Sequence, residues 1–421
     1  MREYKDIIRA FAIFVALVVA CRFSRGAAAL LLAMYGAMCV TRNRPGLALL
    51  SFIYIPLLTQ INPSLLGKVS YLLLASKLGL ALIAGISILQ AARRHGRFVL
   101  PIGVLYVYLV VATFCSIGGW CPVISYLKVL NFLIFLVGVH FATKNLNRYP
   151  TELKIVRDGI LAFACFLVFG SILSYFVPSI GYANAVRSEQ MYGATGAEAE
   201  ILANLMESGR MMLFAGVTNH SQTLSALMVA MYAWTLFDLI FIVRRFDRLH
   251  VAILAASPIL LFMTRSRLGL LGFAVSSFLA VSFVMPKVRI SPVLKQRLKS
   301  AFFGFIVLGA IGAVGAEVAN QSISRWIRKT DDIEGDVREL SEAFTESRMG
   351  LVERNMYDFS LNPFLGMGFQ TSEEHKYLYE AGAISILSAP IEKGVLPTMV
   401  LGETGILGAI VFAFFLIKSI A

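Results

Sequence analysis

The chain has 421 residues, of which 58% are apolar and 15% are charged. This composition excludes a soluble globular domain, because such a domain cannot bury that much apolar surface. The formal net charge of +13 does not indicate a nucleic-acid-binding protein, since the 38 Lys and Arg residues lie mostly in short segments between apolar runs. Cations in such segments orient a membrane protein and contact anionic lipids.

Apolar runs of about 15 to 22 residues, bounded by charges or by Pro and Gly, recur along the chain. Runs of this length predict membrane-crossing helices. We therefore expect an all-α polytopic membrane protein with about twelve transmembrane helices and a helical outer loop. The predicted spans are residues 7–21, 26–40, 46–61, 70–90, 98–118, 122–142, 159–178, 221–243, 250–264, 268–286, 301–319 and 396–417.

Positive charge is distributed unequally between the connecting segments. The start of the chain and the segments that follow the even-numbered spans hold 21 of the 38 Lys and Arg residues. Cytoplasmic loops of membrane proteins carry an excess of these residues. We therefore predict that both termini lie in the cytoplasm and that the two long loops, residues 179–220 and 320–395, lie outside it.

The same pattern predicts four parts: N-terminal membrane helices (1–178), central membrane helices with an outer loop at 179–220 (179–319), a large outer helical loop (320–395), and a last membrane helix (396–421). The large loop has a helical pattern of its own. Asn362-Pro363 is expected to end that helix. Its apolar stripe consists of Ile333, Val337, Leu340, Phe344, Leu351 and Phe359.

Four arginines are predicted on the outer face: Arg210, Arg265, Arg267 and Arg348. Arg265 and Arg267 interrupt an apolar sequence and predict a tight membrane hairpin or a broken helix. Arg348 occupies an apolar position of the stripe, four residues after Phe344. Guanidinium groups stay charged and bind two oxygens at once, so the cluster indicates a diphosphate ligand. Alternatively, Arg265 and Arg267 anchor the hairpin in lipid headgroups. The alternative for Arg348 is that its stem packs on the stripe while its charged end reaches solvent.

The outer face also holds candidates for a general base, namely His375, Glu392 and Glu403. Histidine has a suitable intrinsic pKa, and we rank His375 first, although its charged surroundings are equally typical of solvated surface. Glu403 lies inside the last span, where an acid is costly; it has either a functional role or a hydrogen bond to a neighbouring helix. Asn219 and His220 precede the eighth span, where Asn219 is also a candidate helix cap.

Cofactor motifs are absent from the sequence. Gly366-Met367-Gly368 lacks the third glycine of a nucleotide-binding loop, and neither an Asp-X-Asp motif nor a His/Cys cluster occurs. We therefore expect no cofactor and no metal. The five cysteines are expected to be free thiols that pack as small apolar residues, with a disulfide between Cys115 and Cys121 as the alternative.

Four segments resemble the bacterial O-antigen ligase and O-antigen polymerase family, in the family's order. Residues 210–220 resemble the element that enters the eighth span, and 264–269 resemble the family's Ser-Arg-Gly turn, with Arg267 as its arginine. Residues 362–369, with Ser347-Arg348 upstream, are similar to the Asn-Pro-Leu-Gly-Gly-Phe element. Residues 402–408 are similar to the closing Glu-Gly-Gly span. The resemblance covers roughly residues 205–415.

The resemblance implies a membrane glycosyltransferase of the C-type architecture in the bacterial inner membrane. It would transfer or polymerise an undecaprenyl-diphosphate-linked glycan at the outer face of that membrane, inverting the anomeric centre without a metal. The implied partners are this lipid-linked glycan, an acceptor glycan or lipid A core, membrane lipids and a chain-length regulator protein. One departure concerns the base: Glu392 stands near the place of the family's His-Asn pair, and His375 lies upstream of it.

The first functional interpretation is an exopolysaccharide or O-antigen polymerase. A ligase that transfers glycan to lipid A core needs the same diphosphate site and is the alternative within the enzyme class. The alternative from another class is a secondary transporter of an anionic solute. A transporter predicts inverted repeats and broken helices near the middle of the membrane. The sequence has no evident repeat, and its arginines cluster at one face.

Overall fold

The protein is described by a computed structural model. It describes residues 5–23, 25–61, 79–86, 103–144, 146, 149–177, 214–218, 221–264, 266–286, 288, 291–300, 303–304, 340–381 and 396–420. For some helical residues, among them Arg267, Arg348 and His375, only the backbone is described.

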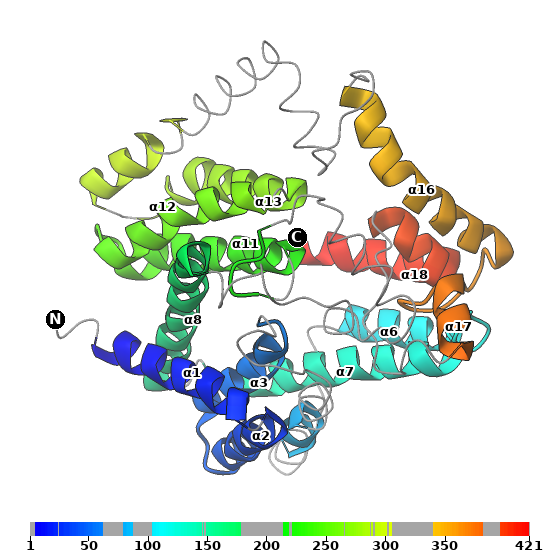
Figure 1. Cartoon of the computed structure of the whole chain (residues 1–421), viewed down its shortest axis with the longest axis horizontal. Helices are drawn as coiled ribbons and strands as arrows, with labels where there is room; N and C mark the ends of the chain where they lie inside the picture. Colours follow the sequence, from blue (N-terminus) through cyan, green and yellow to red (C-terminus); the bar gives the residue numbers. More distant parts are fainter. Residues whose placement is uncertain are drawn as a thin grey trace.

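The described residues form helices and no β-sheet (Figure 1), which confirms the predicted helical class. The helices are α1 (Lys5–Phe23), α2 (Arg25–Thr41), α3 (Pro45–Thr59), α6 (Gly103–Cys115), α7 (Pro122–Lys144), α8 (Pro150–Phe176), α11 (Ser221–Asp238), α12 (Arg248–Met263), α13 (Arg267–Leu279), α16 (Leu340–Leu361), α17 (Glu373–Glu380) and α18 (Leu396–Ile420). A π-helical turn follows α11 as η4 (Leu239–Val243), and another follows α13 as η5 (Ala280–Val284).

Three of the described helical segments are long and apolar enough to cross a membrane: Pro150–Phe176, Ser221–Val243 and Leu396–Phe414. Shorter apolar helices accompany them, among them Arg248–Met263 and Gly269–Val284. These segments coincide with predicted spans, although α8 begins well before the predicted span at 159–178. The total of about twelve spans stays a prediction.

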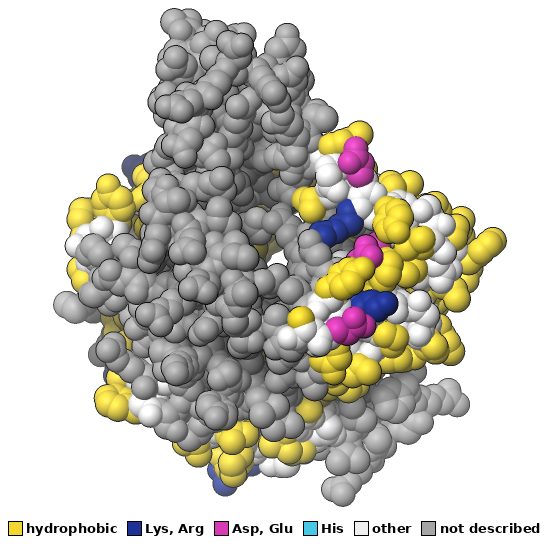
Figure 2. All heavy atoms as spheres, turned by 45° about the vertical axis from the view of Figure 1, so that its right-hand side comes forward, with side chains coloured by type: hydrophobic (Ala, Val, Ile, Leu, Met, Phe, Trp, Pro, Cys, Tyr) yellow, Lys and Arg dark blue, Asp and Glu magenta, His cyan; other side chains and the backbone are white. Residues whose placement is uncertain are grey.

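The surface of the described helices is rich in apolar side chains. Figure 2 shows a face on which such side chains cover much of the described part, with a few acidic and basic side chains between them. Large exposed apolar residues include Phe114 on α6 and Ile410 and Phe414 on α18. An apolar outer surface on apolar helices is what contact with lipid requires, so it agrees with a membrane protein.

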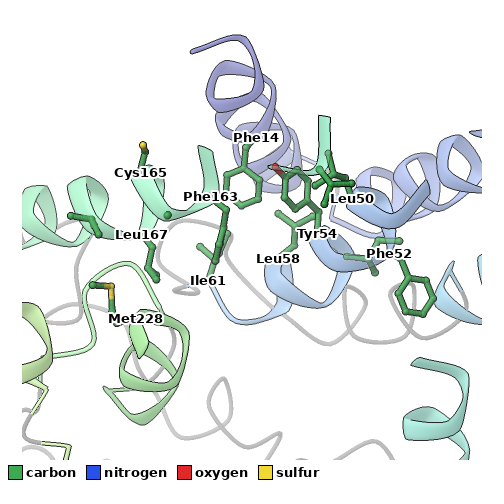
Figure 3. Close-up of a cluster of buried hydrophobic side chains, with 14 of the residues drawn as sticks. Phe14, Leu50, Phe52, Tyr54, Leu58, Ile61, Phe163, Cys165, Leu167 and Met228 are labelled. Carbon is green, nitrogen blue, oxygen red and sulfur yellow. The ribbon is translucent and has the colours of Figure 1, made fainter. Parts of the chain in front are cut away.

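A core of large side chains joins α1, α3, α8 and α11, as Figure 3 shows. Phe14 of α1 is fully buried, and its ring packs edge-on against Tyr54 at 4.9 Å and against Phe163 at 5.4 Å between centroids. The Tyr54 hydroxyl donates to the Gly159 carbonyl at 2.8 Å, so this buried polar group has a partner. The N-terminal helices therefore pack directly on the central ones.

Buried ion pairs join the helix ends that were predicted to be cytoplasmic. Arg157 Nε donates to both carboxylate oxygens of Asp238, at 2.8 and 3.0 Å. The ring nitrogens of His250 lie 2.7 Å from an Asp238 oxygen and 2.5 Å from an Asp247 oxygen. Both nitrogens can donate to these carboxylates only when the imidazole is protonated. The network thus ties α8, α11 and α12 together.

A backbone contact also joins two segments that were predicted to lie on the outer side. Ile61, just after α3, forms an isolated antiparallel bridge with Thr218, just before α11, and both were predicted to face outward. In Figure 1 the N-terminus lies at the left, whereas α16 and α17 of the large loop lie at the right. The bridge therefore joins two segments that were both predicted to face outward, while the side of the membrane that each helix end faces stays a prediction.

The charged network at Asp238 gives a stability prediction. Asp238→Asn leaves the half-buried Arg157 and the buried His250 without their shared carboxylate, and it should destabilise the protein by about 3 kcal/mol. Thermal unfolding of the detergent-purified variant measures this. The matched comparison is Asp6→Asn, which removes an exposed ion pair with Lys154 and should leave the unfolding temperature nearly unchanged. Equal unfolding temperatures for the two variants would contradict a stabilising role of the network.

Candidate functional site

Helix α18 is broken at Gly405, a feature that the sequence did not predict. The backbone of Gly405 has φ 61° and ψ −166°, in a region that only glycine adopts readily. A break in an apolar helix removes partners from backbone N–H and C=O groups, and in a membrane these groups must find other partners. The break therefore marks a place where another segment has to pair with α18.

The 362–372 loop is that segment. It follows α16 and pairs with the backbone of α18 on both sides of Gly405. The Met367 and Gly368 N–H groups donate to the carbonyls of Gly402 (2.8 Å) and Glu403 (3.1 Å), and the N–H groups of Ile406 and Leu407 donate to the carbonyls of Pro363 (2.8 Å) and Phe364 (3.4 Å). The segments that resemble the family's Asn-Pro element and closing Glu element are thus one structural unit.

The turn of the loop is closed by Asn362. Its carbonyl accepts from Gly366 N–H at 2.8 Å, and its side-chain oxygen accepts from Leu365 N–H at 3.3 Å. Asparagine and proline favour such a turn because one bonds its own backbone and the other presets φ. The prediction that Asn362-Pro363 ends the helix is confirmed, since α16 ends at Leu361.

Glu403 lies at the centre of this unit. Its side chain is 1% exposed, and the neighbouring Thr404 is fully buried. Tyr108 of α6 lies close enough to Glu403 for an electrostatic interaction and is itself buried. Next to them Gly402 packs against the backbone of Asn355, where a Cβ would lie 2.7 Å from the Asn355 carbonyl oxygen. A carboxylate is therefore enclosed where α6, α16 and α18 meet.

The α12–α13 turn forms a second part of the site. Thr264 ends α12, and Ser266 caps α13 by accepting from Gly269 N–H at 3.2 Å, so the chain is interrupted between the two apolar runs, as both the hairpin and the broken helix predicted. The first turn of α13 packs tightly on the beginning of α11: a Cβ on Gly269 would lie 2.0 Å from Ser225 Oγ. The N-terminal parts of two helices therefore lie side by side at the end where Arg267 begins α13.

A sequence profile of the O-antigen ligase family matches residues 250–413. This segment of the chain belongs to the O-antigen ligase family. The matched segment of the O-antigen ligase domain contains the α12–α13 turn, the 362–372 loop and the break in α18. No curated protein and no solved structure matches the chain. The family indicates a bacterial membrane protein that transfers glycan in O-antigen assembly.

The structure describes the residues that were predicted for the site to different extents. Glu403 is fully described and lies at the junction of the two motif segments. For three predicted residues the structure describes the backbone and not the side chain. Arg267 begins α13, Arg348 lies in α16, and His375 lies in α17. Whether the arginines converge on one ligand stays a prediction. Outside the described residues lie Arg210, Asn219, His220, Arg265 and Glu392.

The cysteines and the possible metal ligands were also subjects of prediction. All five cysteines are buried free thiols, as expected, and Cys115 Sγ donates to the Thr404 carbonyl at 3.5 Å. Among the described residues, no three His, Cys, Asp or Glu side chains are grouped as metal ligands.

Two residues of α16 were missed from the sequence. Asn355 is fully buried and its amide nitrogen donates to Thr398 Oγ1 at 3.2 Å, while Asp358 is 1% exposed. Both continue the helical stripe of Leu351 and Phe359, at i+4 and i+7 from Leu351. A polar residue at an apolar position of this helical stripe was therefore the signal that could have found both residues. Arg348 was predicted as a site residue on the same signal.

Proposed function

We propose that this protein is a membrane glycosyltransferase that polymerises undecaprenyl-diphosphate-linked oligosaccharide at the outer face of the cytoplasmic membrane. The observation that carries the proposal is the family match, whose segment contains both parts of the site. The transfer is proposed to invert the anomeric centre, because a direct displacement of the diphosphate by the acceptor hydroxyl forms the new bond on the opposite face.

The α12–α13 turn supports a diphosphate site. The N-terminus of a helix attracts anions because its first N–H groups have no partner within the helix and its dipole is positive there. The side-by-side starts of α11 and α13 strengthen this effect. Arg267, the first residue of α13, adds a guanidinium whose two-pronged geometry suits phosphate oxygens. These groups supply the positive charge that stabilises a leaving diphosphate, so the proposed transfer needs no metal.

Glu403 is the proposed general base. The acceptor hydroxyl must lose its proton as the sugar bond forms, to a group within hydrogen-bond reach. Glu403 is buried on α18 next to the break, and its own carbonyl accepts one of the bonds that join the 362–372 loop to this helix. Its side chain is enclosed in this state, so the acceptor sugar is proposed to reach it from the side of the 362–372 loop.

Lysine at position 267 tests the diphosphate assignment. A lysine keeps the charge but not the planar fork, so Arg267→Lys should reduce transfer by about 100-fold or more. Initial rates with lipid-linked oligosaccharide measure the effect. Arg297→Lys is the matched comparison, because Arg297 lies in a predicted cytoplasmic segment with its guanidinium 4.4 Å from the Phe246 ring centre. Wild-type rates for Arg267→Lys would exclude a bidentate contact there.

Product analysis tests the function itself. Purified protein in liposomes receives a radiolabelled undecaprenyl-diphosphate oligosaccharide, with and without lipid A core. The proposal expects glycan polymers on undecaprenyl diphosphate. Glycan attached only to lipid A core would identify a ligase instead. Uptake of a free anionic sugar phosphate without any transfer would replace the enzyme by a transporter.

A further inference from the structure

The turn between α6 and α7 lies outside the segment that matches the family, yet it contacts that segment closely. A Cβ on Gly119 would lie 2.3 Å from the Met367 carbonyl oxygen, and the same oxygen accepts from Trp120 N–H at 3.0 Å. The buried Ser125 hydroxyl donates to the Phe369 carbonyl at 3.0 Å. The N-terminal half of the chain thus holds the backbone of the 362–372 loop.

Trp120 binds two elements at once. Besides its backbone contact to Met367, its indole Nε1–H donates to Asp358 Oδ1 at 2.9 Å. Asp358 is almost fully buried on the last turns of α16. A hydrogen bond to a buried charged acceptor is among the stronger kinds in proteins. Trp120 therefore fixes the end of α16 and the loop that follows it relative to each other.

Lys128 forms a second attachment. It lies six residues into α7, an apolar helix where a cation is costly and is functional by default. Its ammonium donates to the Gln370 carbonyl at 2.8 Å. Gln370 has φ 54°, an unfavourable conformation for a residue other than glycine, which persists only where its surroundings hold it. The Lys128 contact is one such constraint on the loop.

We propose that Trp120 and Lys128 are positioning residues of the transfer reaction. By holding the 362–372 loop against the break in α18, they keep Glu403 in the geometry that transfer requires. This inference rests on the proposed function, and it assigns a role in catalysis to the α6–α7 region outside the family segment. Small displacements of a reacting group cost large factors in rate, about 100-fold for 1 Å.

Trp120→Phe tests the inference in the full-length protein in liposomes. Phenylalanine keeps an aromatic ring and loses the N–H donor. We expect kcat to fall about tenfold or more, with KM for the lipid-linked donor unchanged and the protein folded. Hydrogen exchange of the Met367 and Gly368 amides should become faster, because their bonds to α18 loosen. Trp234→Phe makes the same change at an exposed position of α11 and should alter neither kcat nor the exchange of these amides.

Lys128 provides the second test, so the inference does not depend on the folding of one variant. Lys128→Met should lower kcat and speed exchange of the same amides, and Lys128→Arg, which keeps a donor, should restore both in large part. Unchanged exchange in Trp120→Phe and Lys128→Met would overturn the positioning role, whatever the activity. Faster exchange with parental kcat would also overturn it, because the attachment would then be structural only. A parent protein that transfers no glycan would instead refute the proposed function, while the exchange data would still report on the attachment.

Discussion

Glutamine at position 403 should reduce glycan transfer by about 100-fold or more while the protein stays folded and binds its lipid-linked donor. A general base contributes about 10² to 10⁴ in rate, and glutamine has nearly the shape of glutamate but cannot accept the proton. The substitution also preserves hydrogen-bonding capacity at a site that is 1% exposed. It therefore separates proton transfer from packing.

Single-turnover transfer at saturating acceptor, with donor binding measured separately, gives this comparison. Glu353→Gln makes the same chemical change at an exposed position of α16 and should react like the parent. His375→Ala and Glu392→Gln complete the set, since both are candidates from the sequence. Normal turnover by Glu403→Gln together with loss in one of these two would move the base to that residue. Normal turnover by all three would mean that leaving-group stabilisation by the arginines carries the rate.

Local features of the site were predictable from the sequence. The charges of Arg265 and Arg267 between apolar runs predicted the α12–α13 turn, and Asn362-Pro363 predicted the end of α16. Such signals are local, because they depend on the intrinsic preferences of a few adjacent residues. Glu403 was likewise recognisable as a costly group, because an acid within an apolar run is expensive to bury in a membrane.

The pairing between distant segments was not predictable in the same way. Gly405 lies in an apolar run whose composition is typical of a continuous helix, and nothing local distinguishes a glycine with positive φ from one that is helical. The attachment of Trp120 to Asp358 joins residues 238 positions apart. Contacts of this kind depend on how helices pack, so the order of residue types along one chain does not reveal them.

Alanine at position 405 should separate the two motif segments. Its Cβ would lie 2.3 Å from the Phe364 carbonyl carbon and 2.6 Å from Leu365 N, which are backbone atoms that cannot move aside cheaply. In addition, alanine disfavours the φ and ψ of Gly405 by about 1 to 3 kcal/mol. We expect the 362–372 loop to lose its bonds to α18, transfer to fall about 100-fold, and the unfolding temperature to drop.

Gly350→Ala is the matched substitution, and its expected effect has the opposite sign. Gly350 is helical in α16, and a Cβ there would meet no atom within 4 Å apart from the backbone of its own helix and its chain neighbours. Alanine should stabilise such a position by about 0.5 to 1 kcal/mol, because it loses less conformational freedom in a helix. Transfer rates, thermal unfolding and hydrogen exchange of Met367 and Gly368 measure both variants. Slow exchange of the Met367 and Gly368 amides in Gly405→Ala, together with transfer at the parental rate, would contradict this prediction. It would mean that α18 functions without its break at residue 405. The break would then not be what positions Glu403.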